Sequence, residues 1–223
     1  MKNLVILMLL LAGAAFAQES KFEIKNASKI YNVKLTVEKC DDQRLCEGAA
    51  VFTLNKKGQT APFQVIRLEN TSFYLEDDGT PLVNETLLYD KQSVLSFGDY
   101  NFDGIDDISL RDGNNSGYGG PSYQIYLYSP KARKFVLNAG LTTLGQENLG
   151  MFEVDKKKKI LTTFSKSGCC WHKTEQYTVV ANRPVKIFEE VEDASIADEE
   201  RVKITTRRRV KGRWKTTVKY TKR

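Results

Sequence analysis

Short stretches in which apolar and polar residues alternate recur along most of the chain, and this period of two predicts β-strands. The stretch 31–39 has on one face the side chains of Tyr31, Val33, Leu35 and Val37. The stretch 122–128 likewise has on one face Tyr123, Ile125 and Leu127. Further strand-like stretches, separated by turn-forming residues, occupy 51–54, 63–68, 72–75, 93–97, 108–110, 134–137, 151–154, 160–164, 177–181 and 185–191.

Helical patterns are scarce in the same chain. No window after the first 17 residues has the long, capped, amphipathic pattern of a helix, and the acidic stretch 189–200 comes closest, as a short helical turn. Short hairpins at fairly regular intervals predict an all-β fold, in which antiparallel hairpins form a small propeller-like or sandwich domain. No repeat is strict enough to count propeller blades.

The last 23 residues, 201–223, also alternate and predict a terminal hairpin. Its two apolar rows are Val202, Ile204, Thr206 and Val210, then Trp214, Thr216, Val218 and Tyr220. A three-residue loop at 211–213 would pair Val210 with Trp214 and place both rows on one side. The segment holds 11 basic residues and no acidic one. We expect a structural hairpin with a basic outer face and no binding of nucleic acid.

The first 17 residues have the pattern of a secretory signal peptide. Lys2 precedes the apolar run Leu4–Ala15, and Ala-Phe-Ala precedes Gln18, so cleavage is expected after Ala17. The run is too short to cross a bilayer, and no second apolar run reaches spanning length. The sequence therefore predicts a periplasmic or secreted protein without a membrane span, with residues 18–223 as a single all-β domain.

The charge of the chain is divided unevenly between its two parts. The net charge is +6, but residues 18–200 hold 22 basic and 28 acidic residues and thus carry −6. An acidic body of this kind favours basic partners.

Export places the four cysteines in an oxidising compartment, where we expect them to be paired. The favoured pairing joins Cys40 to Cys46 and Cys169 to Cys170, and the alternative is a pair of long-range bridges between the two regions. A zinc site is disfavoured, because the cysteine spacing is not that of a zinc knuckle and the chain has one histidine.

The most specific motif is the run 99–107, which matches D-x-N-x-D-G-x-x-D. Oxygen ligands at alternate positions converge on a hard cation, and the glycine at the sixth position permits the sharp turn. The pattern predicts a Ca²⁺ site in a strand–loop–strand setting, because the twelfth position is Leu110 and not the glutamate of an EF-hand. The expected ligands are Asp99, Asn101, Asp103, the backbone carbonyl of Ile105, and Asp107.

A second candidate surface is the loop 111–122, which is rich in Gly and Asn and presents Tyr118 near Tyr123. A loop that carries an aromatic residue and is fixed at its base by an ion suits contact with a partner, and the alternative is a long connecting loop whose tyrosines pack down. His172, beside the cysteine pair 169–170, is either a surface or half-buried strand residue, which the sequence alone favours, or a contact residue held rigid by the adjacent cysteines. The chain has no Gly-x-Ser-x-Gly elbow and no spacing that singles out a catalytic carboxylate pair, so no enzymatic activity is expected.

These segments together resemble a known family. The run 96–108, the glycine-rich loop, Tyr123–Tyr128 and Gly168–His172 look like exported bacterial proteins similar to the periplasmic inhibitors of i-type lysozyme. Some relatives are immunity proteins against lysozyme-like effectors of type IV secretion systems. The resemblance covers about residues 90–180.

The resemblance implies an all-β fold, calcium in the loop 99–107, and a loop that enters the cleft of a lysozyme-like glycoside hydrolase. In such inhibitors a Ser-Gly-x-Tyr loop enters the cleft. Here Ser116 and Gly117 are followed directly by tyrosine, so Tyr118 and Tyr123 are both candidates, with His172 in support. Two other hypotheses about the function remain: a calcium-stabilised envelope structural or adhesion protein, and a secreted hydrolase.

Overall fold

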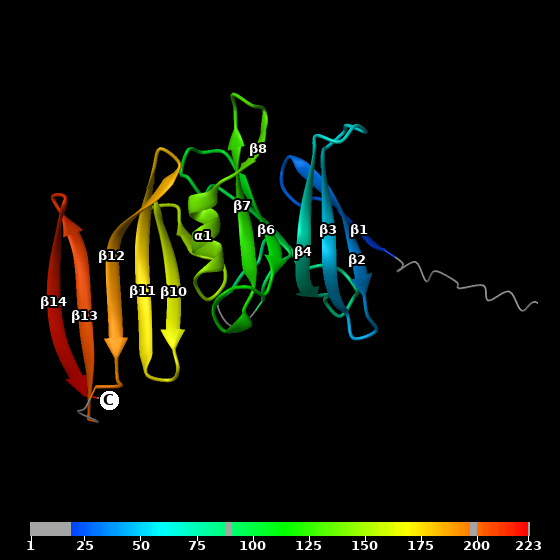
Figure 1. Ribbon diagram of the computed structural model, residues 1–223. Coiled ribbons are helices and arrows are strands. Elements are labelled where there is room, and N and C mark those ends of the chain that lie inside the picture. Colours follow the sequence, from blue (N-terminus) through cyan, green and yellow to red (C-terminus); the bar gives the residue numbers. More distant parts are fainter. Residues whose placement is uncertain (1–18, 88–90, 197–199, 223) are drawn as a thin grey trace, which may run out of the picture.

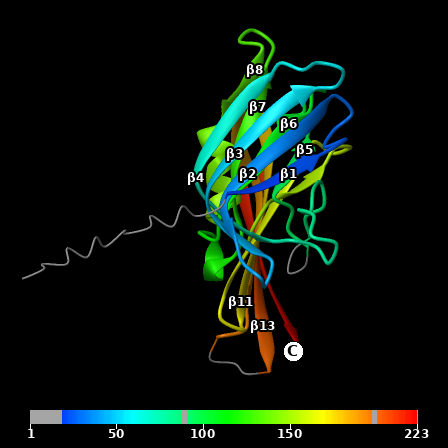
Figure 2. The same ribbon diagram turned by 90° about the vertical axis from the view of Figure 1, so that its right-hand side faces the viewer.

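The structure is a computed structural model that describes residues 19–87, 91–196 and 200–222. The predicted signal peptide lies outside the described residues. Three antiparallel sheets follow one another along the molecule, in the order of the sequence (Figure 1). In Figure 2 the first sheet lies in front of the other two, so the sheets succeed one another along one axis. The all-β prediction is thereby confirmed. The described residues contain no helix long and apolar enough to cross a membrane.

The first sheet has the order β1-β2-β3-β4 and contains most of the predicted stretches 31–39, 51–54, 63–68 and 72–75, the last two of which form one strand. Its strands are β1 (Ser20–Ile24), β2 (Tyr31–Cys40), β3 (Leu45–Lys56) and β4 (Gln64–Tyr74). The apolar face predicted for β2 is buried at every position.

The second sheet has the order β5-β6-β7-β8 and is covered on both faces. Its strands are β5 (Leu95–Gly98), β6 (Asp107–Gly113), β7 (Ser122–Ser129) and β8 (Lys134–Leu137). One hydrophobic cluster joins the first sheet to Ile108 and Leu110, and a second joins Ile125 and Leu127 to the elements that follow. Every residue of β6 is buried as a result.

The sequence did not predict helix α1 (Ala139–Gln146), which lies between the second and third sheets (Figure 1). Asn138 caps it, since its side chain accepts a hydrogen bond from the Leu141 amide at 2.9 Å. Buried Leu141 and Leu144 pack in the second cluster. An eight-residue helix with two glycines has little stability of its own, so tertiary packing decides its formation.

The third sheet has the order β14-β13-β12-β11-β10-β9. Its strands are β9 (Glu153–Asp155), β10 (Ile160–Ser167), β11 (Trp171–Val180), β12 (Arg183–Asp193), β13 (Arg201–Val210) and β14 (Arg213–Lys222). The prediction of a helical turn in 189–200 was wrong for residues 189–193, which continue β12 as strand. Residues 197–199 lie outside the described part of the chain.

The basic terminal hairpin is present, but its predicted turn was wrong. The turn has two residues, Lys211 and Gly212, with φ of 49° and 79°, and Val210 pairs with Arg213. Two residues with positive φ are typical of the tight turn that matches the twist of paired strands. Arg209 therefore stands opposite Trp214, and the two apolar rows lie on opposite faces of the hairpin.

An ionic cluster lies on β11 and β12. Glu175 is buried, and it accepts hydrogen bonds from the ammonium groups of Lys186 and, at 3.1 Å, Lys173. Burial raises the pKa of Glu175, but these two partners more than offset it, so the pKa lies below its ordinary value.

This cluster predicts loss of stability in acid. A carboxyl group whose pKa is lowered by folding stabilises the fold above its unfolded pKa, and that stability is lost as the pH falls through the folded value. Glu175→Gln should therefore cost about 2 kcal/mol of unfolding free energy at pH 7. The cost should shrink below about pH 4. Denaturant unfolding at both pH values measures it, and a cost independent of pH would contradict the role of the charge.

Candidate functional site

The predicted calcium loop connects β5 to β6, and its polar side chains face its own backbone. The carboxylate of Asp99 accepts hydrogen bonds from the amides of Asp103 and Gly104, at 3.0 and 2.9 Å. Asn101 and Asp103 each accept one more from an amide within the loop. Gly104 has φ of 89°, which a side chain would strain. These oxygen donors belong to the class that Ca²⁺ prefers.

Asp107, the fifth predicted ligand, lies buried at the base of this loop. Its two oxygens accept hydrogen bonds from the amides of Tyr100 and Tyr128, each at 2.9 Å. The pKa of Asp107 is raised to about 7, because burial and, to a smaller extent, the negative charges of Asp103 and Asp99 outweigh the two amides, which lower it. The three carboxylates are thus neighbours in the fold. Each oxygen of Asp107 keeps a second lone pair with which it can coordinate a cation.

As they are placed, the described residues contain no group of three His, Cys, Asp or Glu side chains that forms a metal cluster. An ion held here would therefore require the carboxylates to exchange amide hydrogen bonds for coordination. The residue types, their spacing and their proximity fit calcium, and the site remains a prediction.

The calcium loop and the candidate contact loop lie at opposite ends of β6. The contact loop was predicted to begin at residue 111, but residues 111–113 belong to β6, so the loop follows Gly113. The calcium loop leads into Asp107, so six residue steps of about 3.3 Å, or roughly 20 Å, separate the two loops. We expected an ion at the base of the contact loop, and this expectation was wrong. A bound ion would stabilise the far end of the strand.

A partly buried hydrogen-bond network fixes the contact loop instead. Arg111 donates to the side chain of Asn114 at 2.7 Å, and Asn114 donates to the Ser72 hydroxyl at 3.0 Å. Ser116 is buried, and its backbone carbonyl and amide bond to Gly119 and Gly120. The loop therefore has a defined shape despite its glycines, and Ser116 positions it without presenting its own side chain.

Gly117 attaches the loop to the segment that leads into the third sheet. Its amide donates to the carbonyl of Asn148 at 3.0 Å. A side chain at this position would approach Leu149 to 3.2 Å, tighter than ordinary contacts. The close approach explains the glycine.

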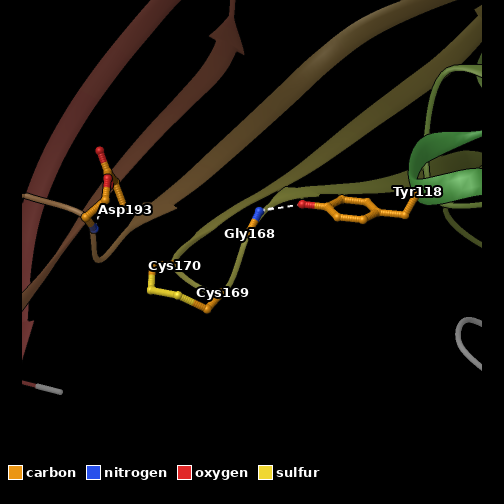
Figure 3. The surroundings of a disulfide bond; sticks show 6 residues. Tyr118, Gly168, Cys169, Cys170 and Asp193 are labelled. Carbon is orange, nitrogen blue, oxygen red and sulfur yellow. Dashed lines mark hydrogen bonds between the residues drawn. A yellow bond between two sulfur atoms is a disulfide. The ribbon is translucent and has the colours of Figure 1, made fainter.

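Tyr118 is the exposed aromatic residue of the loop, with 65% of its surface accessible. Its backbone lies in the left-handed region, at φ of 58°. Its hydroxyl accepts a hydrogen bond from the amide of Gly168, at the tip of the β10–β11 hairpin (Figure 3). The ammonium of Lys166 lies 5.2 Å from the ring centroid. Tyr118 thus joins the loop to the third sheet while its ring remains exposed.

Tyr123 has the opposite environment, and its prediction as a contact residue was wrong. It is completely buried on β7, and its hydroxyl donates to the Ser93 carbonyl at 3.0 Å. Burial raises the pKa of Tyr123 to about 12. The sequence contained the signal, because Tyr123 shares the apolar face of its strand with Ile125 and Leu127.

His172 lies on β11, close to the region of Tyr118. Its ring stacks on Phe164 with centroids 5.8 Å apart, and its Nδ1 lies 4.0 Å from the Glu192 carboxylate. Across the sheet it pairs with Lys166, the residue whose ammonium lies against the Tyr118 ring. The sequence did not identify Lys166 as a residue of this site. Its antiparallel pairing with His172 places it there.

The disulfides have the pairing that the sequence favoured. Cys40 is bonded to Cys46 where β2 and β3 meet, and Cys169 to Cys170 in the turn between β10 and β11. Figure 3 shows the second bridge beside Gly168, the partner of Tyr118. The carbonyl of Cys170 accepts a hydrogen bond from the Ala194 amide at 2.7 Å, which ties this turn to the end of β12.

Comparisons with known proteins find a similar solved structure. No protein-family model matches the chain, and no curated protein matches it. The solved structure is that of a Xanthomonas type IV secretion system related protein, with a TM-score of 0.68. The match covers 90% of this chain and 93% of that chain at 24% identity. Similarity at this identity shows a shared fold.

Proposed function

We propose that the protein is an exported inhibitor of a lysozyme-like peptidoglycan hydrolase, and that it inserts Tyr118 into the cleft of the enzyme. The observation that carries the proposal is the state of Tyr118, which is 65% exposed although hydrogen bonds hold the surrounding loop. An exposed aromatic side chain on a preformed loop loses little conformational entropy on binding, so it serves well as an anchor.

Two further observations support this partner. The structural neighbour is described as related to type IV secretion, and lysozyme-like effectors of such systems are countered by immunity proteins of the family that the sequence resembles. The acidic body, with −6 over residues 18–200, complements the basic surface that lysozymes commonly have. Two paired disulfides accord with export.

The direct test is the turnover of peptidoglycan by a lysozyme-like hydrolase in the presence of increasing amounts of purified protein. We expect turnover to fall as the protein is added, and we expect the protein alone to release no fragments. Release of fragments by the protein alone would favour the alternative hypothesis that the protein is itself a secreted hydrolase. Undiminished turnover across a panel of lysozyme-like enzymes would contradict the proposal.

A second candidate is a calcium-stabilised envelope structural or adhesion protein, and the exposed basic hairpin β13–β14 favours it. This candidate predicts that reversing a charge on the hairpin, as in Arg207→Glu, abolishes the structural or adhesive function. It also predicts that Tyr118→Ala has no effect on that function. The inhibitor proposal predicts the reverse pattern.

We also propose that the loop 99–107 binds Ca²⁺ as a stabilising ion. With a dissociation constant near 10⁻⁴ M, typical of extracellular sites, about 10 mM calcium would add roughly 2.7 kcal/mol of stability. The thermal midpoint should then rise by about 5–10 °C. Asp103→Ala should remove most of this rise, as measured by thermal unfolding in calcium and in chelator.

Asp106→Ala is the matched control, because Asp106 lies in the same loop, is exposed and occupies a position that is not a ligand position. It should keep the rise. Equal midpoints of the wild-type protein in calcium and in chelator would contradict the site. Since the contact loop lies at the other end of β6, inhibition by the folded protein should survive chelation.

A further inference from the structure

Strand β14 forms an open edge of the third sheet. It is the terminal strand in the order β14-β13-β12-β11-β10-β9, and all ten of its residues are exposed. In Figure 1 it lies at the end of the molecule farthest from the first sheet. The outer edge of such a strand carries backbone donors and acceptors that a further strand can pair with.

The side chains of β14 are divided between its two faces by chemistry. One face carries Arg213, Lys215, Thr217, Lys219 and Thr221, and the other carries Trp214, Thr216, Val218, Tyr220 and Lys222. The three large apolar side chains among these, Trp214, Val218 and Tyr220, are 40, 48 and 52% exposed. One face of β14 is thus cationic, and its other face is largely apolar and aromatic. On this second face the guanidinium groups of Arg207 and Arg201 of β13 lie 5.4 and 5.1 Å from the ring centroids of Trp214 and Tyr220.

Charged residues on an edge strand commonly serve to prevent a second copy from pairing with it. The cations of β14 can do so here, because an antiparallel copy centred on Thr217 would place Lys215 opposite Lys219. Protection alone does not account for the other face, which leaves Trp214, Val218 and Tyr220 exposed beside the open edge. The two faces together suit one kind of added strand.

We propose that β14 binds an extended acidic segment of a partner protein, which adds to the sheet as a seventh strand. Its side chains would alternate between Asp or Glu, which face Lys215 and Lys219, and apolar residues, which face Trp214 and Val218. Cross-strand pairs of opposite charge and of apolar with aromatic residues are those that stabilise neighbouring strands. This site is separate from the Tyr118 loop and does not depend on the proposed inhibition.

The test uses the full mature chain and a labelled peptide as long as β14, with alternating Glu and Val residues and blocked ends. Fluorescence anisotropy should detect saturable binding. Methylation of the peptide amides that face β14 should weaken binding at least about tenfold, because it removes the donors that strand addition needs. Lys215→Glu with Lys219→Glu should weaken it by a similar factor.

If the double variant does not bind the Glu–Val peptide, a peptide of opposite charge keeps the test decisive. A peptide of alternating Lys and Val should bind the double variant and not the wild-type chain, which also shows that the variant is folded. Lys34→Glu with Arg67→Glu is the matched control, since it changes the net charge equally on exposed positions of the first sheet.

Two outcomes would overturn the proposal. The first is absence of binding by the Glu–Val peptide. The second is equal binding by the amide-methylated peptide together with tighter binding of phosphatidylglycerol vesicles or duplex DNA, which would assign the hairpin to a polyanionic surface.

Discussion

Replacing Tyr118 by alanine should weaken inhibition of a lysozyme-like hydrolase by about 30-fold or more. An aromatic anchor at the centre of an interface contributes about 2 kcal/mol or more, which corresponds to this factor. The change should leave stability nearly unaltered, because the ring is exposed and the loop around it is held by backbone bonds. The inhibition constant and the thermal midpoint of the variant measure both expectations.

Tyr74→Ala is the matched control for this experiment. Tyr74 is also 65% exposed, but it lies on β4 of the first sheet. Its replacement should leave inhibition unchanged. Equal losses from both variants would mean that the assay reports general surface hydrophobicity, and an inhibitor unaffected by Tyr118→Ala would require a different contact residue.

Tyr118→Phe separates the ring from the hydroxyl. It keeps the aromatic surface but removes the acceptor of the Gly168 amide, which links the contact loop to the hairpin that carries Cys169 and Cys170. If the hydroxyl only positions the ring, the phenylalanine variant should retain most of the inhibition that the alanine variant loses.

Replacing Tyr123 by alanine should lower the free energy of unfolding by about 3–5 kcal/mol. The side chain is completely buried between β7 and helix α1, so its removal leaves a cavity in the second cluster and takes away the hydrogen bond to Ser93. Denaturant unfolding measures this loss, and the thermal midpoint should fall by roughly 2–4 °C for each kcal/mol.

Tyr123→Phe provides the complementary control. It keeps the packing and removes one hydrogen bond, so it should cost about 1 kcal/mol and leave inhibition by the folded protein intact. A stable Tyr123→Ala variant that fails to inhibit would contradict its burial and restore Tyr123 as a contact residue.

The relation between the calcium loop and the contact loop changes what the ion can do. In the sequence only five residues separate Asp107 from Gly113, and this short distance suggested a common site. Because those residues form an extended strand, the two loops lie at its opposite ends. The rigidity of the contact loop comes from Arg111, Asn114 and Ser72. Chelation and loop mutations should therefore affect stability and inhibition separately.

The sequence by itself determined most of the strands, because a strand with one buried face must alternate and the alternation is local. The buried faces of β2 and β7 were both recognised in this way. The same pattern had already placed Tyr123 on the apolar face of β7. The pairing of Cys40 with Cys46 needed only a hairpin between neighbouring strands, so proximity along the chain was sufficient.

Only the tertiary structure decided what each local feature contacts. Helix α1 forms because it covers the second sheet, since its own eight residues have little helical stability. The register of the terminal hairpin depends on positive φ at Lys211 and Gly212, which alternation cannot specify. The turn is one residue shorter than predicted, and this difference moved one apolar row to the other face of the hairpin. The position of the Tyr118 side chain depends on contacts with Gly168 and Lys166, about fifty residues away along the chain. Alternation identifies a face, but long-range packing determines what covers it.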